Sequence, residues 1–515
     1  MIETPVGGEI IRSRKRPWIF IVISVVLAVC AIVIPISVVV TSRHGSSSDA
    51  NLADIKSAKK SNRTEHRGGS SVGPDGLAAK PKWNFSKDKM IGLSLGNWLV
   101  LERWMNEDWF VDKAGPNSWD EWSFTMAQGS NATNALEEHW STWVTEDDIE
   151  KVYRAGINTL RIPTGFWMWI DTVSPEPFIQ QGQMAHFERV CGYAYARNMY
   201  IIIDLHGLPG SQNGEQQSGH NTTTPSFYQP LQQARSDLTV KAVVDWVSQS
   251  PFHSIISAIE VANEPRPYTT EQRAMLRAYY ERSYNTIQTL GDKAPAMFFA
   301  DGYVPGNRLA YWYDFAAAHK TEPPSLLFTD HPYPGFFPAQ NNSADIFKQT
   351  CTKGAQYQNF PVTTAITEWS LRTGIQENAF DKSYYSIQLS TWSWFAGSCF
   401  WSLRVLDSKN PVLADPVAQY QFSFLSLLER GSILIPEKNR SASDFIASIQ
   451  SPCGAPVALN SNAPPPQGTA AATAISAAAE AKALIDGINK SVAEAGKGLH
   501  NSKSALNGIA NTSTK

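Results

Sequence analysis

The stretch Ile259-Glu260-Val261-Ala262-Asn263-Glu264-Pro265 is the part of this sequence that decides the fold prediction. The largely apolar run from Ser254 to Ala262 is typical of a buried parallel strand, and Asn-Glu-Pro ends it abruptly. A charged residue at the end of such a strand lies at the mouth of a barrel, where functional groups gather. We therefore interpret Glu264 as a candidate functional residue.

A second stretch further along the chain has the same form. The segment from Val362 to Ile366 is strand-like, and Thr367-Glu368-Trp369-Ser370 ends it. Either glutamate alone would more often be a solvated residue at a strand end. Together, two strand-terminal glutamates indicate a carboxylate pair that acts on a glycosidic bond.

Strand-like and helix-like segments alternate around these two stretches. The strand-like runs are Met90–Leu95, Ile157–Ile162, Met199–Leu205, Ser254–Ala262, Ala296–Ala300, Leu326–Thr329, Val362–Ile366 and Gly397–Leu403. Helix-like segments between them include Glu146–Arg154, Met184–Arg197, Leu238–Val247, Thr270–Leu290 and Tyr384–Trp394. Strands that alternate with helices in this number predict an α/β fold, a (β/α)8 TIM barrel over residues 83–454.

A basic cluster from Arg12 to Arg16 precedes an apolar run, Trp18–Val40. Such a run is long enough to cross a bilayer, which takes about 20 residues, whereas a cleaved signal peptide has an apolar region of only about 7–15. Basic residues keep their side of a span in the cytoplasm. We predict a cytoplasmic tail (1–16) and a transmembrane signal anchor (17–41). The rest of this single-pass type II protein would lie on the outer side of the plasma membrane. A cleaved signal is the alternative.

The segments that flank the predicted barrel differ from it in composition. Residues 42–82 are rich in Ser, Gly, Lys, Asn and Arg without an apolar face, which predicts a flexible stalk. Residues 455–515 are rich in Ala, Pro, Ser and Asn, which favours a disordered tail over a short helix. Glycosylation triplets, which fit an extracellular glycoprotein, begin at Asn62, Asn84, Asn131, Asn221, Asn341, Asn439, Asn489 and Asn511.

Composition narrows the classes of function. The chain has 17 Trp and 11% aromatic residues, which suits sugar stacking and equally a Trp-containing core. Its net charge of −3 gives no preference for nucleic acid. The 5 cysteines include no close C-x-x-C pair, and no Gly-rich phosphate loop occurs. We expect no metal, no cofactor and a monomer.

The predicted barrel resembles glycoside hydrolase family five, specifically the fungal exo-β-1,3-glucanases. The matching stretches are Leu95-Gly96-Asn97-Trp98-Leu99-Val100-Leu101-Glu102, Arg161-Ile162-Pro163, Asp204-Leu205-His206-Gly207 with Pro209-Gly210-Ser211-Gln212-Asn213-Gly214, Asn263-Glu264-Pro265, His331-Pro332-Tyr333, Glu368-Trp369-Ser370 and Phe400-Trp401. Asn-Glu-Pro alone is a weak signal. The whole set, in order and with each motif at or near a strand end, is specific.

The resemblance implies that Glu264 is the general acid/base and Glu368 the nucleophile. Hydrolysis with retention needs two carboxyl groups about 5–5.5 Å apart, which the ends of the fourth and seventh strands can supply across a small barrel. The resemblance also places Arg161 and Tyr333 near Glu368, where they would keep it ionised. Arg161 as a purely structural ion pair is the alternative.

Further residues look like sugar-binding groups by the same resemblance. Asn263 would bind the 2-hydroxyl, and Glu102, His206 and His331 the other hydroxyls at the closed end of the pocket. Trp401 would form an apolar floor beneath the ring. The alternatives are that His206 and Trp401 are ordinary core residues.

The chain departs from the family pattern at Glu215, where Phe usually follows Gln-Asn-Gly and frames the entrance for the leaving glucan. Phe336 still matches the opposite side of that entrance. The preference for the leaving group is therefore open. Thr367, where Gly is common, is a minor difference.

The cysteines are expected to differ in state. Cys30 lies in the predicted span, and Cys191 and Cys399 have apolar surroundings that favour free, buried thiols. Cys351 and Cys453 lie in loop-like stretches. The resembling enzymes suggest that these two form a disulfide.

The predicted function is that of a membrane-tethered retaining exo-β-1,3-glucanase, a glucan 1,3-β-glucosidase that releases glucose from β-glucan in cell-wall metabolism. An endo-β-glucanase or a β-glucan transglucosylase on the same scaffold is the alternative within the enzymes. A wall-binding protein with an inactive barrel is the alternative from another class, and the intact Glu264 and Glu368 count against it.

Overall fold

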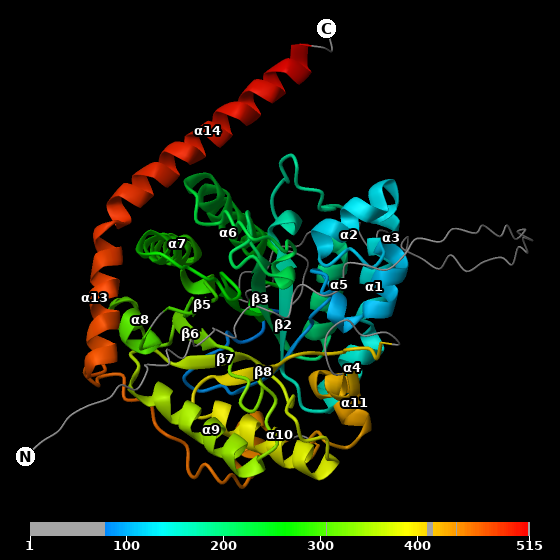
Figure 1. Cartoon of the computed structure of the whole chain (residues 1–515), viewed down its shortest axis with the longest axis vertical. Helices are drawn as coiled ribbons and strands as arrows, with labels where there is room; N and C mark the ends of the chain where they lie inside the picture. Colours follow the sequence, from blue (N-terminus) through cyan, green and yellow to red (C-terminus); the bar gives the residue numbers. More distant parts are fainter. Residues whose placement is uncertain (1–77, 305, 409–415, 439, 513–515) are drawn as a thin grey trace, which may run out of the picture. The chain divides into compact units, whose positions relative to one another are not determined.

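A computed structural model describes residues 78–304, 306–408, 416–438 and 440–512 (Figure 1). Within them, parallel strands close into a barrel in the order β1-β2-β3-β4-β5-β6-β7-β8. The strands are β1 (Met90–Ser94), β2 (Thr159–Gly165), β3 (Tyr200–Gly207), β4 (Ile256–Glu260), β5 (Ala296–Ala300), β6 (Leu326–Asp330), β7 (Thr364–Trp369) and β8 (Gly397–Phe400). The predicted α/β fold with a closed parallel barrel is confirmed.

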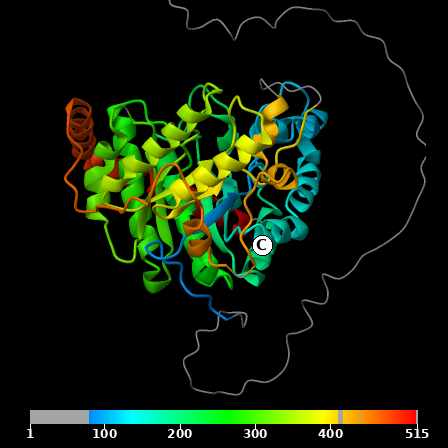
Figure 2. The same cartoon turned by 90° about the horizontal axis from the view of Figure 1, so that it is seen from below.

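Helices surround the barrel (Figures 1 and 2). They are α1 (Glu107–Ala114), α2 (Glu121–Gln128), α3 (Ala132–Trp143), α4 (Glu146–Arg154), α5 (Gln183–Ala196), α6 (Pro230–Gln249), α7 (Thr270–Gln288), α8 (Arg308–Ala318), α9 (Ser343–Gln356), α10 (Asn378–Trp392), α11 (Phe424–Glu429), α12 (Ala442–Ala447), α13 (Thr469–Ala483) and α14 (Ile485–Thr512). Short 3-10 turns are η1 (Arg103–Met105), η2 (Gly129–Asn131), η3 (Phe166–Met168), η4 (Gln216–Ser218), η5 (His253–Ile255), η6 (Gly291–Lys293), η7 (Tyr357–Asn359) and η8 (Pro416–Phe422).

The strands read as continuous apolar runs because both of their faces are covered. One face packs on the helices, and the other fills the barrel interior with a cluster that includes Ile202, Phe298 and Leu327. Local signals set the helix starts. Thr145 and Asp148 form a capping box at α4, for example, and accept each other's backbone N–H groups.

The C-terminal segment corrects the prediction of a disordered tail over 455–515. Its residues form α13 and α14, which pack along the outside of α6, α7 and α8 and are coloured orange to red in Figures 1 and 2. Ala474, Ala478, Ile488 and Val492 are buried there. The composition of α13 was misleading because its buried residues are alanines, which are apolar enough to pack closely but give little amphipathic contrast.

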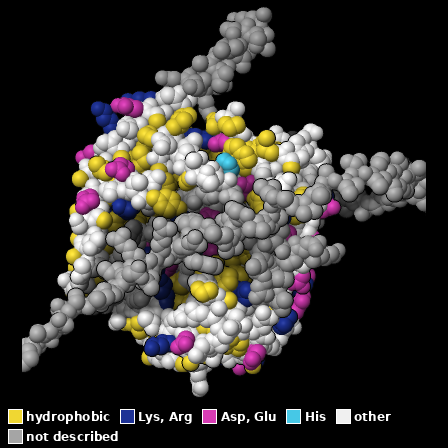
Figure 3. Space-filling model, viewed as in Figure 1, with side chains coloured by type: hydrophobic (Ala, Val, Ile, Leu, Met, Phe, Trp, Pro, Cys, Tyr) yellow, Lys and Arg dark blue, Asp and Glu magenta, His cyan; other side chains and the backbone are white. Residues whose placement is uncertain are grey.

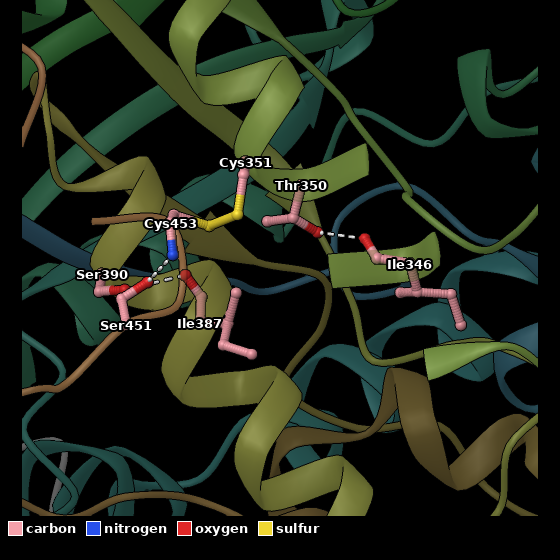
Figure 4. The surroundings of a disulfide bond; sticks show 7 residues. All are labelled: Ile346, Thr350, Cys351, Ile387, Ser390, Ser451 and Cys453. Atoms are coloured by element: carbon pink, nitrogen blue, oxygen red, sulfur yellow. Dashed lines mark hydrogen bonds between the residues drawn. A yellow bond between two sulfur atoms is a disulfide. The ribbon is translucent and has the colours of Figure 1, made fainter. Parts of the chain in front are cut away.

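The predicted disulfide is confirmed. Cys351 of α9 is bonded to Cys453, which follows α12, with a Cα–Cα distance of 5.0 Å. Figure 4 shows this bond beside Ile387 and Ser390 of α10. Cys191 and Cys399 are free and buried, as expected.

The predicted cytoplasmic tail, the signal anchor with Cys30 and most of the stalk lie outside the described residues. No helix in the described ranges is long and apolar enough to cross a membrane. The last residues of the predicted stalk are ordered on the barrel: Lys80 donates a hydrogen bond to Asn198, and Lys82 to the carbonyl of Asp292.

Candidate active site

A pocket of about 740 Å³ lies at the carboxyl ends of the strands. Its lining includes most of the predicted site residues: Glu102, His206, Asn263, Glu264, His331, Tyr333, Phe336, Glu368 and Trp401. Within the ring of helices, acidic and hydrophobic side chains are interspersed near the centre of the face seen in Figure 3. Parallel strands bring these residues together because all their carboxyl ends meet at one rim.

Glu368 on β7 is held by two donors. Arg161 Nη1 lies 2.8 Å from one carboxylate oxygen, and the Tyr333 hydroxyl lies 2.8 Å from the other. The side chain is nearly buried, with 7% exposed. These bonds fix the orientation of the carboxylate, which suits a nucleophile.

Arg161 does not line the pocket but lies fully buried beneath it, and it pairs with three carboxylates. Its nitrogens lie 2.7 Å from Glu260, 2.8 Å from Glu368 and 3.0 Å from Asp204. A further bond of 2.8 Å reaches the side-chain oxygen of Asn263. Arg161 is therefore both a structural ion pair and the group that holds the candidate nucleophile, so the two interpretations of the sequence were not exclusive.

Glu264 follows β4 in a left-handed conformation with φ of 44°. His331 Nδ1 donates to it over 2.9 Å and Gln217 Nε2 over 3.3 Å, and the Tyr303 hydroxyl also donates to it. Burial raises the pKa of Glu264, but the hydrogen bond and charge of His331 and the bond from Tyr303 outweigh it and lower this pKa to about 2. Glu264 is thus ionised at neutral pH.

The pKa of His331 is shifted in the opposite direction to that of Glu264. Burial lowers its pKa, but the charges of Glu368 and Glu264 outweigh burial and raise the pKa to about 9. Its Nε2 lies 2.9 Å from the Thr367 hydroxyl, so both ring nitrogens are engaged. At neutral pH one proton therefore lies on His331, one hydrogen bond away from Glu264.

The two glutamates approach each other closely across the pocket. Glu264, His331 and Glu368 each place an oxygen or nitrogen within 4.8 Å of the others. Carboxyl groups about 5–5.5 Å apart are typical of retaining glycosidases, and about 6.5–9.5 Å of inverting ones. The nearest carboxylate oxygens of Glu264 and Glu368 are closer together than the inverting range.

Glu264, His331 and Glu368 also have the donor atoms of a metal site. Arg161 and Tyr333 already donate hydrogen bonds to the two carboxylate oxygens of Glu368, however. A metal would also have to displace the proton of His331. The set is better suited to proton transfer than to cation binding.

His206 and Glu102 are buried residues of the pocket lining. His206 Nδ1 lies 2.6 Å from Asp204, and its ring stacks 5.5 Å from Trp401. Burial raises the pKa of Glu102 to about 7, against the opposing charge of His206 and the hydrogen bond from Trp104. Glu102 therefore both donates and accepts hydrogen bonds near neutral pH, as a hydroxyl ligand must.

The pocket entrance has two different sides. Phe336 packs 4.0 Å from Phe337 and gives an aromatic side. Glu215, which replaces the expected Phe, pairs with Arg266 on the polar side. Arg266 in turn lies 5.4 Å from the ring of Tyr303.

Sequence reasoning missed several residues of this site. They are Trp104, Asp204, Gln217, Glu260, Arg266, Tyr303, Arg372 and Phe422. Asp204 and Glu260 had a readable signal, since a carboxylate inside an apolar strand requires a partner. The others lie in loops or turns that only the barrel brings to one place.

Comparison with known proteins defines the family. Residues 124–394 match the model described as "Cellulase (glycosyl hydrolase family 5)". This stretch is more than half of the chain, and the chain belongs to that family.

Similar proteins include "Probable glucan 1,3-beta-glucosidase A" of Aspergillus fumigatus, 32% identical over 54% of this chain and 64% of the relative. "Glucan endo-1,6-beta-glucosidase B" of Emericella nidulans is 32% identical over 41% of this chain and 52% of the relative. The match thus spans less than two thirds of either relative. The rutinosidase from Aspergillus niger has a TM-score of 0.61 at 23% identity, covers 68% of this chain and 100% of that one, and shares the fold.

Proposed function

We propose that this protein is a retaining exo-β-1,3-glucanase, which releases glucose from the non-reducing ends of β-1,3-glucan. The observation that supports it most is the close approach of Glu264 and Glu368 across a pocket, with Glu368 held by Arg161 and Tyr333. The family and the names of the similar proteins support a β-glucan substrate.

In the first step Glu368 attacks the anomeric carbon and the glycosidic C–O bond breaks. The leaving oxygen takes a proton from Glu264, which receives it from His331 Nδ1 across their 2.9 Å contact. The products are a glycosyl ester on Glu368, a neutral His331 and the shortened glucan. Asn263, held by Arg161, is placed to bind the 2-hydroxyl as the ring flattens.

In the second step water attacks the same carbon and releases Glu368. Glu264 accepts the water proton and passes it to His331, which restores the starting state. Burial of the pair excludes bulk water from competing hydrogen bonds. The net reaction is hydrolysis with retention.

Exo action is supported by two buried polar residues of the pocket lining, Glu102 and His206, which would bind the hydroxyls of a terminal sugar. The alternative is an endo-β-glucanase or a transglucosylase, and the similarity to an endo-1,6-β-glucosidase keeps it in view. Transfer differs only in whether a sugar or water accepts the glycosyl group.

Chromatography of early products distinguishes these functions. Purified protein would be incubated with a laminarin-type β-1,3-glucan and with β-1,4- and β-1,6-glucans. Glucose as the sole early product from the β-1,3-glucan is expected. A ladder of oligomers would indicate endo action, longer products would indicate transfer, and no product from any glucan would contradict the hydrolase.

We propose further that the chain is a type II membrane protein, on the basis of the basic cluster Arg12–Arg16 and the apolar run Trp18–Val40. The protein should remain in the membrane fraction after carbonate extraction and lose mass on deglycosylation. A wholly soluble protein that begins near Ser42 would contradict the anchor.

A further inference from the structure

An ion-pair network built on two buried aspartates lies next to the pocket residues Tyr303 and His331. Arg308, the first residue of α8, bridges Asp330 at the end of β6 with contacts of 3.2 and 2.9 Å, and it also pairs with Asp301 after β5. Asp330 receives two further bonds, 2.8 Å from Lys353 and 2.5 Å from the Tyr357 hydroxyl. Both aspartates are buried.

Each aspartate also fixes the backbone of a pocket residue. Asp301 Oδ1 accepts from the Tyr303 backbone N–H over 2.8 Å, and Asp330 Oδ1 accepts from the His331 backbone N–H over 2.9 Å. Tyr303 has φ of 47°, a conformation that costs a non-glycine residue free energy and needs support from its surroundings.

Tyr303 and His331 both donate a hydrogen bond to the carboxylate of Glu264. The guanidinium of Arg308 therefore orders Asp301 and Asp330, and through them the two residues that donate hydrogen bonds to Glu264. We propose that the Asp301–Arg308–Asp330 network is a positioning device for Glu264, acting through Tyr303 and His331. This inference rests on the proposed hydrolysis, in which Glu264 must pass a proton.

The network should influence the pH dependence of the reaction. Glu260, Glu264, Glu368 and Arg161 face His331, while His206, Arg266, Tyr303 and His331 face Glu264. Among these groups, the two carboxylates in contact with His331 raise its pKa. If the backbone of His331 is held less firmly, its ring contacts Glu264 and Glu368 less closely, and its pKa falls. The proton on His331 is then lost at a lower pH.

The test is Arg308→Lys, which keeps the positive charge and loses the two-pronged contact. Misplacement of a catalytic group by about 1 Å can cost 10²-fold in rate, so kcat/KM on β-1,3-glucan should fall roughly 10- to 100-fold. The basic limb of the kcat/KM pH profile should move to lower pH. An aryl β-glucoside with a good leaving group should lose much less, because it needs little protonation.

Arg235→Lys is the matched control. Arg235 of α6 also forms a bidentate pair, with Glu176 over 2.5 and 2.7 Å, and neither residue lines the pocket. Its side chain is more buried than that of Arg308, 3% against 28% exposed, so the loss of packing in this control is at least as large. This variant should lose thermal stability without moving the pH profile or the ratio of the two substrates.

Equal losses of Arg308→Lys on both substrates with an unmoved pH profile would overturn the proposal, and so would the same profile shift in Arg235→Lys. If Arg308→Lys does not fold, Tyr357→Phe removes a single bond to Asp330. A smaller shift in the same direction supports the network, and an unmoved profile overturns it. Wild-type protein that hydrolyses no β-glucan would instead contradict the proposed function.

Discussion

Glu264 and Glu368 have similar chemistry but different partners, and these partners support the roles proposed for them. Glu368 is bound by a cation and a phenol, whereas Glu264 shares a proton with His331. The two glutamates should therefore respond differently to removal.

Glu368→Gly should lower hydrolysis by several orders of magnitude, because no glycosyl ester can form. Azide should not restore the retained product, although an α-glucosyl fluoride donor can support sugar transfer. Glu264→Ala should still form the ester from a substrate with a good leaving group, and azide should accelerate its breakdown to a β-glucosyl azide. The measurement is turnover and product identity with and without azide. Rescue of Glu368→Gly to the β product, with Glu264→Ala unaffected, would mean that the roles are swapped.

Glu215→Phe should raise kcat/KM on longer β-1,3-glucans several-fold, since an added aromatic contact contributes ~0.5–1.5 kcal/mol. An aryl glucoside should respond little. Because Glu215 pairs with Arg266, the control is Glu215→Gln, which breaks the pair without adding a ring and should give no gain. An equal gain on both substrates would show that position 215 does not contact the leaving glucan.

His331 should make protein stability depend on pH. Its pKa is raised from 6.5 to about 9, so protonation favours the folded state. The contribution is present in full below about pH 6.5 and is lost as pH rises through about 9. The free energy of unfolding in urea should therefore be higher for the wild type than for His331→Gln, and this difference should be larger at pH 6 than at pH 9.5. A difference that does not change with pH would contradict the raised pKa.

At the scale of elements, α13 and α14 extend the domain beyond the barrel. Their buried side chains lie against α6, α7 and α8, so these helices stabilise the outer layer. Composition alone did not reveal this because the buried residues of α13 are alanines, and Ile488 and Val492 of α14 are separated by mostly polar residues.

Val492→Asp should destabilise the protein by several kcal/mol, because it places a charge in a buried contact of α14. Ala493→Asp, at the adjacent exposed position, is the control and should cost less than about 1 kcal/mol. The measurement is the urea midpoint of each variant. Equal losses would show that α14 is not packed on the barrel.

At the scale of the whole molecule, the disulfide joins α9 to the chain that follows α12 across 102 residues. Closing a loop of about 100 residues contributes up to ~4.7 kcal/mol on the chain-entropy model. Reductant should therefore lower the Tm of the wild type. The Cys351→Ala/Cys453→Ala double variant should have this lower Tm already, and reductant should not change it. If reductant leaves the Tm of the wild type unchanged, the disulfide has no stabilising role.

The sequence by itself determined the barrel and predicted that Glu264 and Glu368 meet at its rim. Apolar runs such as Ala296–Ala300 have strand character that local pattern reveals, and parallel strands must place their terminal residues at one rim. Only the tertiary structure decided three contacts. Arg161 pairs with three carboxylates, and His331 contacts Glu264. Arg308 pairs with the two aspartates that bind the backbone of Tyr303 and His331. These contacts join residues far apart in the chain, so no local pattern predicts them. In a buried site, the distances between ionisable groups and the exclusion of water decide which groups are protonated.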